Sequence, residues 1–139
     1  MFIGPATVLV VEDDAMIRIE TIGAIQDEGY LVLSADDADQ ALGALEAHPE
    51  VDVLFTDIRM PGSMDGLALA NWVRRRHPQM EIVIASGNLQ PAADRMPERA
   101  KFLAKPYSAL QIGDILRAMI DQTRPFVLAD DRVLPVMGY

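Results

Sequence analysis

Four short apolar runs in this chain each lead into a polar residue suited to handling a phosphoryl group. The runs span residues 7–11, 51–56, 81–85 and 101–104, and they lead into Glu12-Asp13, Asp57, Ser86 and Lys105. Short, β-branched runs of this kind are typical of buried parallel strands. If the strands form one parallel sheet, the polar groups share its carboxyl edge, where open α/β sheets bind ligands. The sequence therefore predicts a metal-dependent phosphate site at that edge.

Stretches with helical period separate the strands. The first predicts a helix whose apolar stripe is Met16, Ile19, Ile22 and Ile25. Gly29 supplies a stop for this helix, and residues 30–34 read as a further strand, the second along the chain. A second helix is expected to carry the stripe Ala38, Ala41, Leu42 and Leu45 and to end before Pro49.

Three more helices are expected along the rest of the chain. They are a third from Asp65-Gly66 to about His77-Pro78, a weak fourth at about 90–96 between Pro91 and Pro97, and a fifth after the N-cap Ser108. Both His48 and His77 are expected to act as helix C-caps. Five strands that alternate with five helices predict a doubly wound α/β domain.

Composition restricts the function classes. The chain has 139 residues, enough for one packed domain, and 21 acidic against 12 basic residues give it a formal net charge of −9. This charge suits a cation site and argues against a nucleic-acid partner, because non-specific binding there rests on neutralising phosphates. The absence of cysteine excludes disulfides and thiolate metal sites. Without a signal-peptide pattern or an apolar run of roughly 18 residues, we expect a cytoplasmic protein with no membrane partner.

Residues 124–139 break the alternation of strands and helices. Pro125 stops the fifth helix, and two apolar arms, 126–128 and 133–136, flank a polar centre. This pattern suits a docked hairpin or arm, although Asp130-Asp131 is a poor two-residue turn, and a loosely docked tail is the alternative. We therefore divide the chain into a domain over residues 1–123 and a C-terminal tail over residues 124–139.

Asp57 is the candidate nucleophile. It ends the most apolar strand, where an unpaired carboxylate would be costly. A carboxylate can attack phosphorus and form an acyl phosphate. A strand-end Asp that only caps the next loop is the alternative for Asp57 alone, but the polar ends of the other strands favour the chemical role.

Glu12 and Asp13 are the candidate metal ligands. Hard carboxylate oxygens that leave room for several waters suit Mg²⁺. Asp14 is an alternative ligand, although its position suits the N-cap of the first helix better. Ser86 can donate a hydrogen bond to a phosphoryl oxygen, and Lys105 can form an ion pair with one. Taken alone, Ser86 reads as a turn residue, and the peptide bond between Lys105 and Pro106 can be cis.

Together these residues resemble the receiver domain of bacterial two-component response regulators. The matching pieces are Val10-Val11-Glu12-Asp13, Asp57-Ile58-Arg59-Met60-Pro61, Met64-Asp65-Gly66, Ala85-Ser86 and Lys105-Pro106-Tyr107. The resemblance covers about residues 6–122. It implies a flavodoxin-like (CheY-like) doubly wound parallel sheet of five strands in the order 2-1-3-4-5. It also implies a signalling switch that is not a conventional enzyme, and the ordinary start and the tail of the chain lead us to expect a stand-alone regulator.

The resemblance assigns a role to each site residue. Asp57 is implied to be the phospho-acceptor. The implied Mg²⁺ ligands are Glu12, Asp13, Asp57 and the backbone carbonyl of Arg59. The implied phosphate-binding and switch residues are Ser86, Lys105 and Phe102. The bond before Pro106 is implied to be cis.

The resemblance also implies partners. A sensor histidine kinase or a histidine phosphotransfer protein would supply the phosphoryl group. A downstream protein, or a second copy of the chain, would dock on the face made by the fourth helix, the fifth strand and the fifth helix. On the grounds of charge and hydropathy given above, we expect no nucleic-acid or membrane partner.

Two features depart from the family pattern or vary within it. Gly62-Ser63 lengthens the loop after Asp57 by one residue. Because this insertion follows Arg59, we expect the metal site to survive it. Arg59 and Asn88 lie two residues beyond Asp57 and Ser86, at positions that tune phosphoryl lifetime in this family.

Other classes of protein fit the sequence less well. A phosphohydrolase with an aspartyl-phosphate intermediate, resembling the haloacid dehalogenase family, needs a second acid where Arg59 stands. A flavodoxin-like cofactor carrier needs a phosphate-cradling first loop, and Glu12-Asp13-Asp14 would repel the phosphate. A phosphate sink without downstream output is a further alternative. A receiver that is no longer phosphorylated is disfavoured, because every site residue is present.

Overall fold

The structure is a computed structural model that describes residues 4–88 and 90–123. Its centre is a five-stranded parallel sheet with the order β2-β1-β3-β4-β5, as predicted. The strands are β1 (Thr7–Val11), β2 (Leu31–Ala35), β3 (Val53–Asp57), β4 (Glu81–Ser86) and β5 (Lys101–Ala104). β2 therefore lies one residue later than the predicted range of 30–34.

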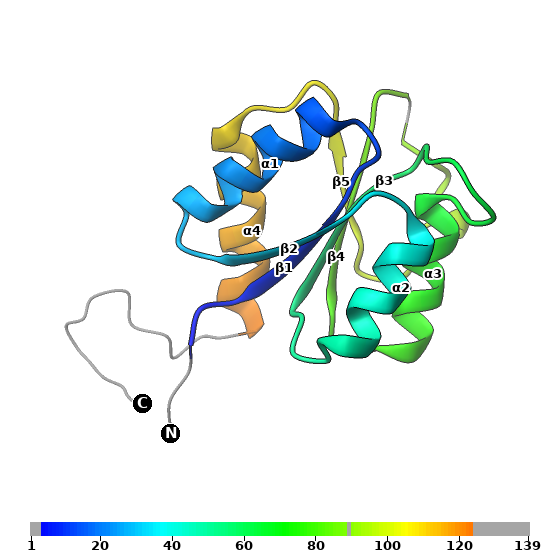
Figure 1. Ribbon diagram of the computed structural model, residues 1–139, viewed down its shortest axis with the longest axis horizontal. Coiled ribbons are helices and arrows are strands. Elements are labelled where there is room, and N and C mark those ends of the chain that lie inside the picture. The colour runs from blue at the N-terminus through cyan, green and yellow to red at the C-terminus, as the bar shows by residue number, and fades with distance from the viewer. Residues whose placement is uncertain (1–3, 89, 124–139) are drawn as a thin grey trace.

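Two pairs of helices cover the two faces of the sheet, as Figure 1 shows. Helices α1 (Ala15–Asp27) and α4 (Ala109–Thr123) cover one face, and α2 (Ala38–Ala47) and α3 (Gly66–Arg76) cover the other. Val8 and Val10 of β1 belong to the core under α1 and α4, whereas Leu9 and Val11 belong to the core under α2 and α3. Since β1 and β3 are buried along their whole length, polar chemistry can reach solvent only beyond their ends.

The prediction of a fourth α-helix at about 90–96 was wrong. The described part of that region contains only a 3-10 helix, η1 (Ala93–Arg95), so the described residues form four α-helices instead of five. Pro91 and Pro97 leave too few residues between them for a stable helix. Met96 is extended, at φ −84° and ψ 138°, as expected for a residue before proline. The predicted fifth helix is α4.

The predicted apolar stripe of the first helix was also partly wrong. Met16 and Ile19 are 71% and 66% exposed, whereas Thr21 and Ile25 are buried. A step of three residues falls about 60° short of a full turn, so Met16 and Ile25 project from opposite sides of α1. The helix stops as predicted, because Gly29 follows its end with a φ of +95°.

The helix caps follow the sequence predictions. Asp14 and Asp65 are the N-caps of α1 and α3, and each side chain accepts a backbone hydrogen bond from the first turn. The hydroxyl of Ser108 accepts a hydrogen bond from the backbone of Gln111 at the start of α4. The C-caps of α2 and α3 are the two histidines, His48 and His77.

Gly66 fixes how α3 starts against the acidic edge of the sheet. Its backbone nitrogen donates a 2.8 Å hydrogen bond to the carbonyl of Ile58. A Cβ atom at Gly66 would lie 1.6 Å from the Asp57 carbonyl oxygen, so no side chain fits there. Gly62, in the lengthened loop, has a φ of +106°, which glycine adopts without strain.

Two further sequence predictions concern membrane spans and the C-terminal tail. None of the helices in the described ranges has the length and apolar character of a membrane span. The predicted C-terminal tail, residues 124–139, lies outside the described residues.

Candidate functional site

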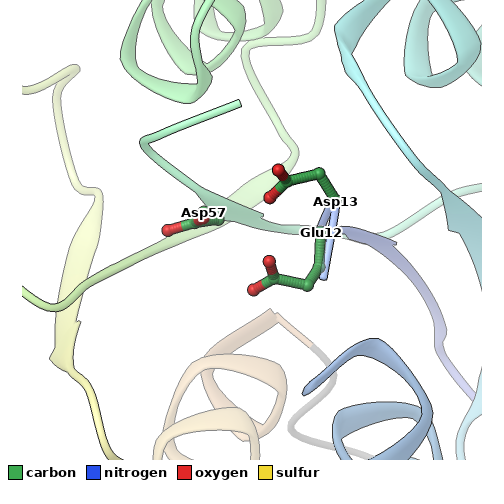
Figure 2. A group of neighbouring side chains, drawn as sticks. All are labelled: Glu12, Asp13 and Asp57. Carbon is green, nitrogen blue, oxygen red and sulfur yellow. The ribbon is translucent and has the colours of Figure 1, made fainter. Parts of the chain in front are cut away.

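Three carboxylates meet at the carboxyl edge of the sheet. Glu12 and Asp13 follow β1, and Asp57 ends the neighbouring strand β3, whose Thr56 pairs with Val11. Carboxylate oxygens from the three residues lie within 4.8 Å of one another. Figure 2 shows the three side chains directed toward the same space. The strand order thus brings together acids that are 44 residues apart in the sequence, from Asp13 to Asp57.

Two of these acids are buried. Glu12 is 3% and Asp57 is 8% exposed, whereas Asp13 is exposed. Burial raises the pKa of Glu12, and the charge of Asp57 adds to the rise. Burial likewise raises the pKa of Asp57, against the opposing effect of Lys105. The cluster therefore carries more negative charge than its surroundings stabilise well.

Lys105 supplies the nearest positive charge. Its Nζ lies 2.7 Å from Glu12 Oε1 and 3.3 Å from Asp57 Oδ1. Burial alone would lower the pKa of Lys105, but the hydrogen bond to Glu12 and the charge of Asp57 outweigh it, so the pKa is raised. The Lys105–Pro106 peptide bond is cis, the isomer that the resemblance implies. Lys105 thus remains charged and bridges the two buried acids.

The donor set fits a hard divalent cation. Two carboxylates about 5 Å apart repel each other by roughly 3 kcal/mol at an effective dielectric near 20. A single ammonium group offsets part of this repulsion, and carboxylate oxygens are the ligands that Mg²⁺ prefers. A cavity of about 460 Å³ adjoins the cluster, and Asp13 and Arg59 both line it. Of the residues predicted to hold Mg²⁺, the three acids therefore meet one another, and Asp13 also shares the neighbouring cavity with Arg59.

Ser86 and Lys105 are tied together on the other side of Asp57. Ser86 is 2% exposed and lies at the end of β4, where its carbonyl accepts a 2.9 Å hydrogen bond from the Lys105 backbone. The Ser86 hydroxyl oxygen accepts a 3.1 Å hydrogen bond from the backbone of Asn88. Because this bond uses an oxygen lone pair, the hydroxyl proton stays available for another acceptor.

Phe102, the predicted aromatic switch residue, is half-buried in the edge strand β5. It pairs with Ile84 of β4, two residues before Ser86. Phe102 therefore lies on the strand next to the one that Ser86 ends.

Sequence reasoning missed several residues that support the site. Arg18 of α1 donates a 2.7 Å hydrogen bond to the Glu12 carbonyl and forms a 3.2 Å ion pair with Asp36. The hydroxyls of Thr21 and Tyr107 share a 2.7 Å hydrogen bond that joins α1 to the loop after Lys105. A polar Thr21 on the inward side of α1 was a signal for this contact, whereas the sequence gives no local sign of the Arg18 contacts.

Arg59 and Asn88 also meet, which the sequence did not predict. With the amide oxygen of Asn88 turned toward Arg59, it accepts hydrogen bonds from Nε at 3.1 Å and Nη2 at 3.2 Å. The loops that follow Asp57 and Ser86 are therefore bridged by exposed side chains beside the acids.

Comparisons with known proteins agree with this geometry. Residues 8–117 match the model of the response regulator receiver domain family. The chain is 37% identical over 123 residues to the sensor kinase CckA of Brucella abortus, and 33% identical over 121 residues to the nitrogen assimilation regulatory protein NtrX of Azorhizobium caulinodans. These matches cover 86% and 84% of the chain but only 13% and 26% of the two relatives.

Solved structures show the same similarity. A response regulator receiver domain protein from Clostridium thermocellum superposes with a TM-score of 0.78 at 25% identity, over 88% of this chain and 99% of that one. NtrX from Brucella abortus gives a TM-score of 0.78 at 32% identity, over 87% of this chain and 28% of that one.

Proposed function

Because the chain belongs to the receiver domain family of two-component response regulators, we propose that it is a signalling switch driven by phosphorylation of Asp57. The observation that carries the proposal is the meeting of Glu12, Asp13 and Asp57 beside Lys105. This arrangement offers a nucleophile, candidate metal ligands and a fixed positive charge in one place. The same three kinds of group are needed to move a phosphoryl group between oxygen or nitrogen atoms.

In the proposed reaction, a carboxylate oxygen of Asp57 attacks the phosphorus of a phosphohistidine on the donor protein. A phosphorus–oxygen bond forms, the phosphorus–nitrogen bond breaks, and the imidazole nitrogen leaves with the bonding electron pair and takes up a proton. Mg²⁺ held by Glu12, Asp13, Asp57 and the Arg59 carbonyl would neutralise charge on the nucleophile and on the phosphoryl oxygens.

The chain's own residues complete the proposed site. Lys105 lies 3.3 Å from Asp57 and can exchange its contact with Glu12 for one with a phosphoryl oxygen. Ser86 can donate its free hydroxyl proton to a second oxygen. Movement of Ser86 would then change the space available to Phe102 on the adjacent strand, as the family resemblance implies.

The proposal extends to partners and location. A sensor histidine kinase or a histidine phosphotransfer protein would supply the phosphoryl group. The phosphorylated protein would signal by contact with a downstream protein or a second copy, with no nucleic acid or membrane, in the cytoplasm. Residues 124–139 would form a tail that modifies this contact.

The direct test is phosphorylation by acetyl phosphate, read by intact mass. With Mg²⁺ present, the mass should rise by one phosphoryl unit, and chelation of Mg²⁺ should prevent the rise. Asp57→Asn should not gain this mass, whereas the control Asp39→Asn, an exposed residue of α2, should gain it normally. Phosphorylation of the Asp57→Asn protein would overturn the assignment. Rapid, repeated turnover of the donor would instead favour a phosphohydrolase.

A further inference from the structure

The charges of this chain are unevenly divided. The stretch from residue 74 to residue 101 holds six of the twelve bases but only three of the twenty-one acids, so it has a charge of +3 in a chain of −9. The bases are Arg74, Arg75, Arg76, Arg95, Arg99 and Lys101. All of the remaining sequence carries a charge of −12. A local positive region on a strongly acidic domain selects partners by charge.

The fold gathers four of these bases on one side of α3: Arg74, Arg75, Arg95 and Arg99. We call these four residues the basic surface. Arg74 and Arg99 both donate hydrogen bonds to the carbonyl of Pro78. Asn71 of α3 donates a 3.0 Å hydrogen bond to the Arg95 carbonyl. Arg75 lies one helical turn after Asn71, so its side chain projects from the same side of α3.

Side chains of α3 hold the basic surface together, although the described residues between β4 and β5 form no α-helix. Arg74 donates from Nε to the Glu98 carbonyl at 2.9 Å and from Nη1 to the Met80 carbonyl at 2.7 Å. The bond to Glu98 and the Asn71 contact hold the segment from η1 to β5 against α3, and the bond to Met80 ties Arg74 to the loop before β4. The bases are therefore presented by a defined surface instead of a free loop.

Within the described residues, acidic groups lie near this surface but form no salt bridge with its bases, and the charges of Glu81 and Glu98 oppose that of Arg99 at Arg74. No salt bridge there involves any of the six bases, whereas Arg18, Lys105 and Arg117 each pair with an acid. Arg74 Nη2 is buried without a hydrogen-bond partner in the described residues. Burial and the nearby charge of Arg99 lower the pKa of Arg74. A negative group beside these guanidinium groups would relieve their repulsion.

We propose that the basic surface is a docking site for a short acidic segment of a partner protein. An acidic segment of a few residues would meet only local charges, because the Debye length is about 8 Å at physiological ionic strength. Duplex DNA carries a charge every ~1.7 Å and would extend along the acidic remainder of the domain, which repels it. The charge distribution therefore favours a short acidic peptide over a long polyanion.

The basic surface is carried by α3 and by the segment after β4, and both begin beside the proposed phosphoryl site. A docking role that responds to phosphorylation therefore rests on the proposed function. Helix α3 begins at Gly66, directly against the Asp57 carbonyl. The segment that carries Arg95 and Arg99 begins after Ser86, whose hydroxyl accepts a hydrogen bond from the Asn88 backbone. A shift of Ser86 toward a phosphoryl oxygen would displace one half of the surface relative to the other. Phosphorylation should therefore change the affinity for the acidic segment.

The test is fluorescence anisotropy with the full chain and a labelled peptide of alternating Glu and Leu residues. The control peptide has Gln in place of Glu. The double variant Arg75→Gln, Arg95→Gln removes two exposed bases whose side chains form no hydrogen bond or salt bridge in the described structure. Arg117→Gln, on α4, is the matched control for the loss of a base elsewhere. A one-turn DNA duplex and anionic vesicles serve as competitors.

We expect the Glu peptide to bind, the double variant to weaken it about five-fold, and Arg117→Gln to change it less than about two-fold. Equal losses in both variants, tighter competition by DNA or vesicles, or no binding by the Glu peptide would overturn the proposal. Self-association that the double variant abolishes would assign the surface to a second copy instead.

If intact mass shows phosphorylated Asp57 but the affinity for the peptide does not change, the coupling fails while the proposed function stands. If no phosphoryl group is incorporated, the proposed function fails, and the peptide result still judges the surface.

Discussion

The loops that follow β3 and β4 leave neighbouring strands at the same edge of the sheet, but they are held differently. Apart from the Arg59–Asn88 contact, backbone groups hold the chain after β3: Ile58 donates to the Ala85 carbonyl at 3.1 Å, and Gly66 donates to the Ile58 carbonyl at 2.8 Å. After β4, side chains of α3 hold the segment, through Asn71 and Arg74. Backbone bonds cannot be exchanged without distorting Asp57, whereas side-chain bonds can be made and released individually.

This difference separates fixed chemistry from movable structure. The loop after β3 positions the proposed nucleophile, Asp57, and a candidate metal ligand, and both roles require a fixed geometry. The segment after β4 contains one 3-10 turn, η1, and depends on exchangeable contacts, which is typical of segments that move at low cost. We therefore expect mutations in the first loop to damage the site and mutations in the second segment to change the response.

The largest effect should come from Gly66→Ala. Its Cβ would overlap the Asp57 carbonyl oxygen, so either the loop or α3 must move, at a cost of about 3 kcal/mol in the free energy of unfolding. Urea denaturation measures this cost. The matched control is Gly23→Ala in α1, where nothing lies within 4 Å of the new methyl group and a small stabilisation is expected. Equal stability of the two variants would contradict a rigid loop after β3.

The next effect is stabilisation by Mg²⁺. A ligand at ten times its dissociation constant stabilises the folded state by about 1.4 kcal/mol. Thermal unfolding at increasing Mg²⁺ should show this rise, because the cation reduces repulsion among Glu12, Asp13 and Asp57. Asp13→Ala should abolish the rise, and the control Asp39→Asn should keep it. A melting temperature that does not change with Mg²⁺ concentration would count against the metal site.

Asn71→Ala should have a smaller effect on stability and a local effect on dynamics. Loss of its hydrogen bonds to the Leu67 and Arg95 carbonyls should cost about 1 kcal/mol. Amide hydrogen exchange should become faster around η1 and remain unchanged around Asp57. Gln79→Ala, at an exposed loop position, is the control. Faster exchange throughout the domain would mean that Asn71 supports the whole fold instead of one segment.

The smallest effect should be on the pH dependence of stability without Mg²⁺. Burial raises the pKa of Glu12 above its ordinary value of 4.5, so the folded state binds this proton more tightly than the unfolded state. The stability contribution is present below that value and is lost as pH rises through the higher folded pKa. Glu12→Gln removes this titration, so its melting temperature should rise relative to the parent as pH increases above 4.5. A difference in melting temperature between the two proteins that stays constant with pH would contradict the raised pKa of Glu12.

The fold and the meeting of the site residues could largely be predicted from the sequence. The acids, Ser86 and Lys105 end apolar strands, and parallel strands bring their carboxyl ends to one edge. The failures arise where local pattern is a poor guide. The prediction of one apolar stripe from Met16 to Ile25 did not account for the rotation that accumulates over repeated three-residue steps.

Contacts between distant segments were the other limit. The hydrogen bonds from Asn71 and Arg74 run to backbone carbonyls. Every residue has such a carbonyl, so the sequence does not indicate which one accepts the bond. The contact of Arg18 with the Glu12 carbonyl is hidden for the same reason. Side-chain pairs such as Thr21 and Tyr107 can be suspected from an inward polar residue, but the partner is known only once the loops are placed.

The central claim is that a phosphoryl group on Asp57 acts beyond its own loop, through the segment after β4. The most direct test compares backbone amide chemical shifts with and without Mg²⁺ and beryllofluoride, which mimics the phosphoryl group. We predict changes that start around Asp57 and continue through residues 88–110, including the region of η1 and Phe102. Changes confined to the loops around Asp57, with residues 88–110 silent, would contradict the account.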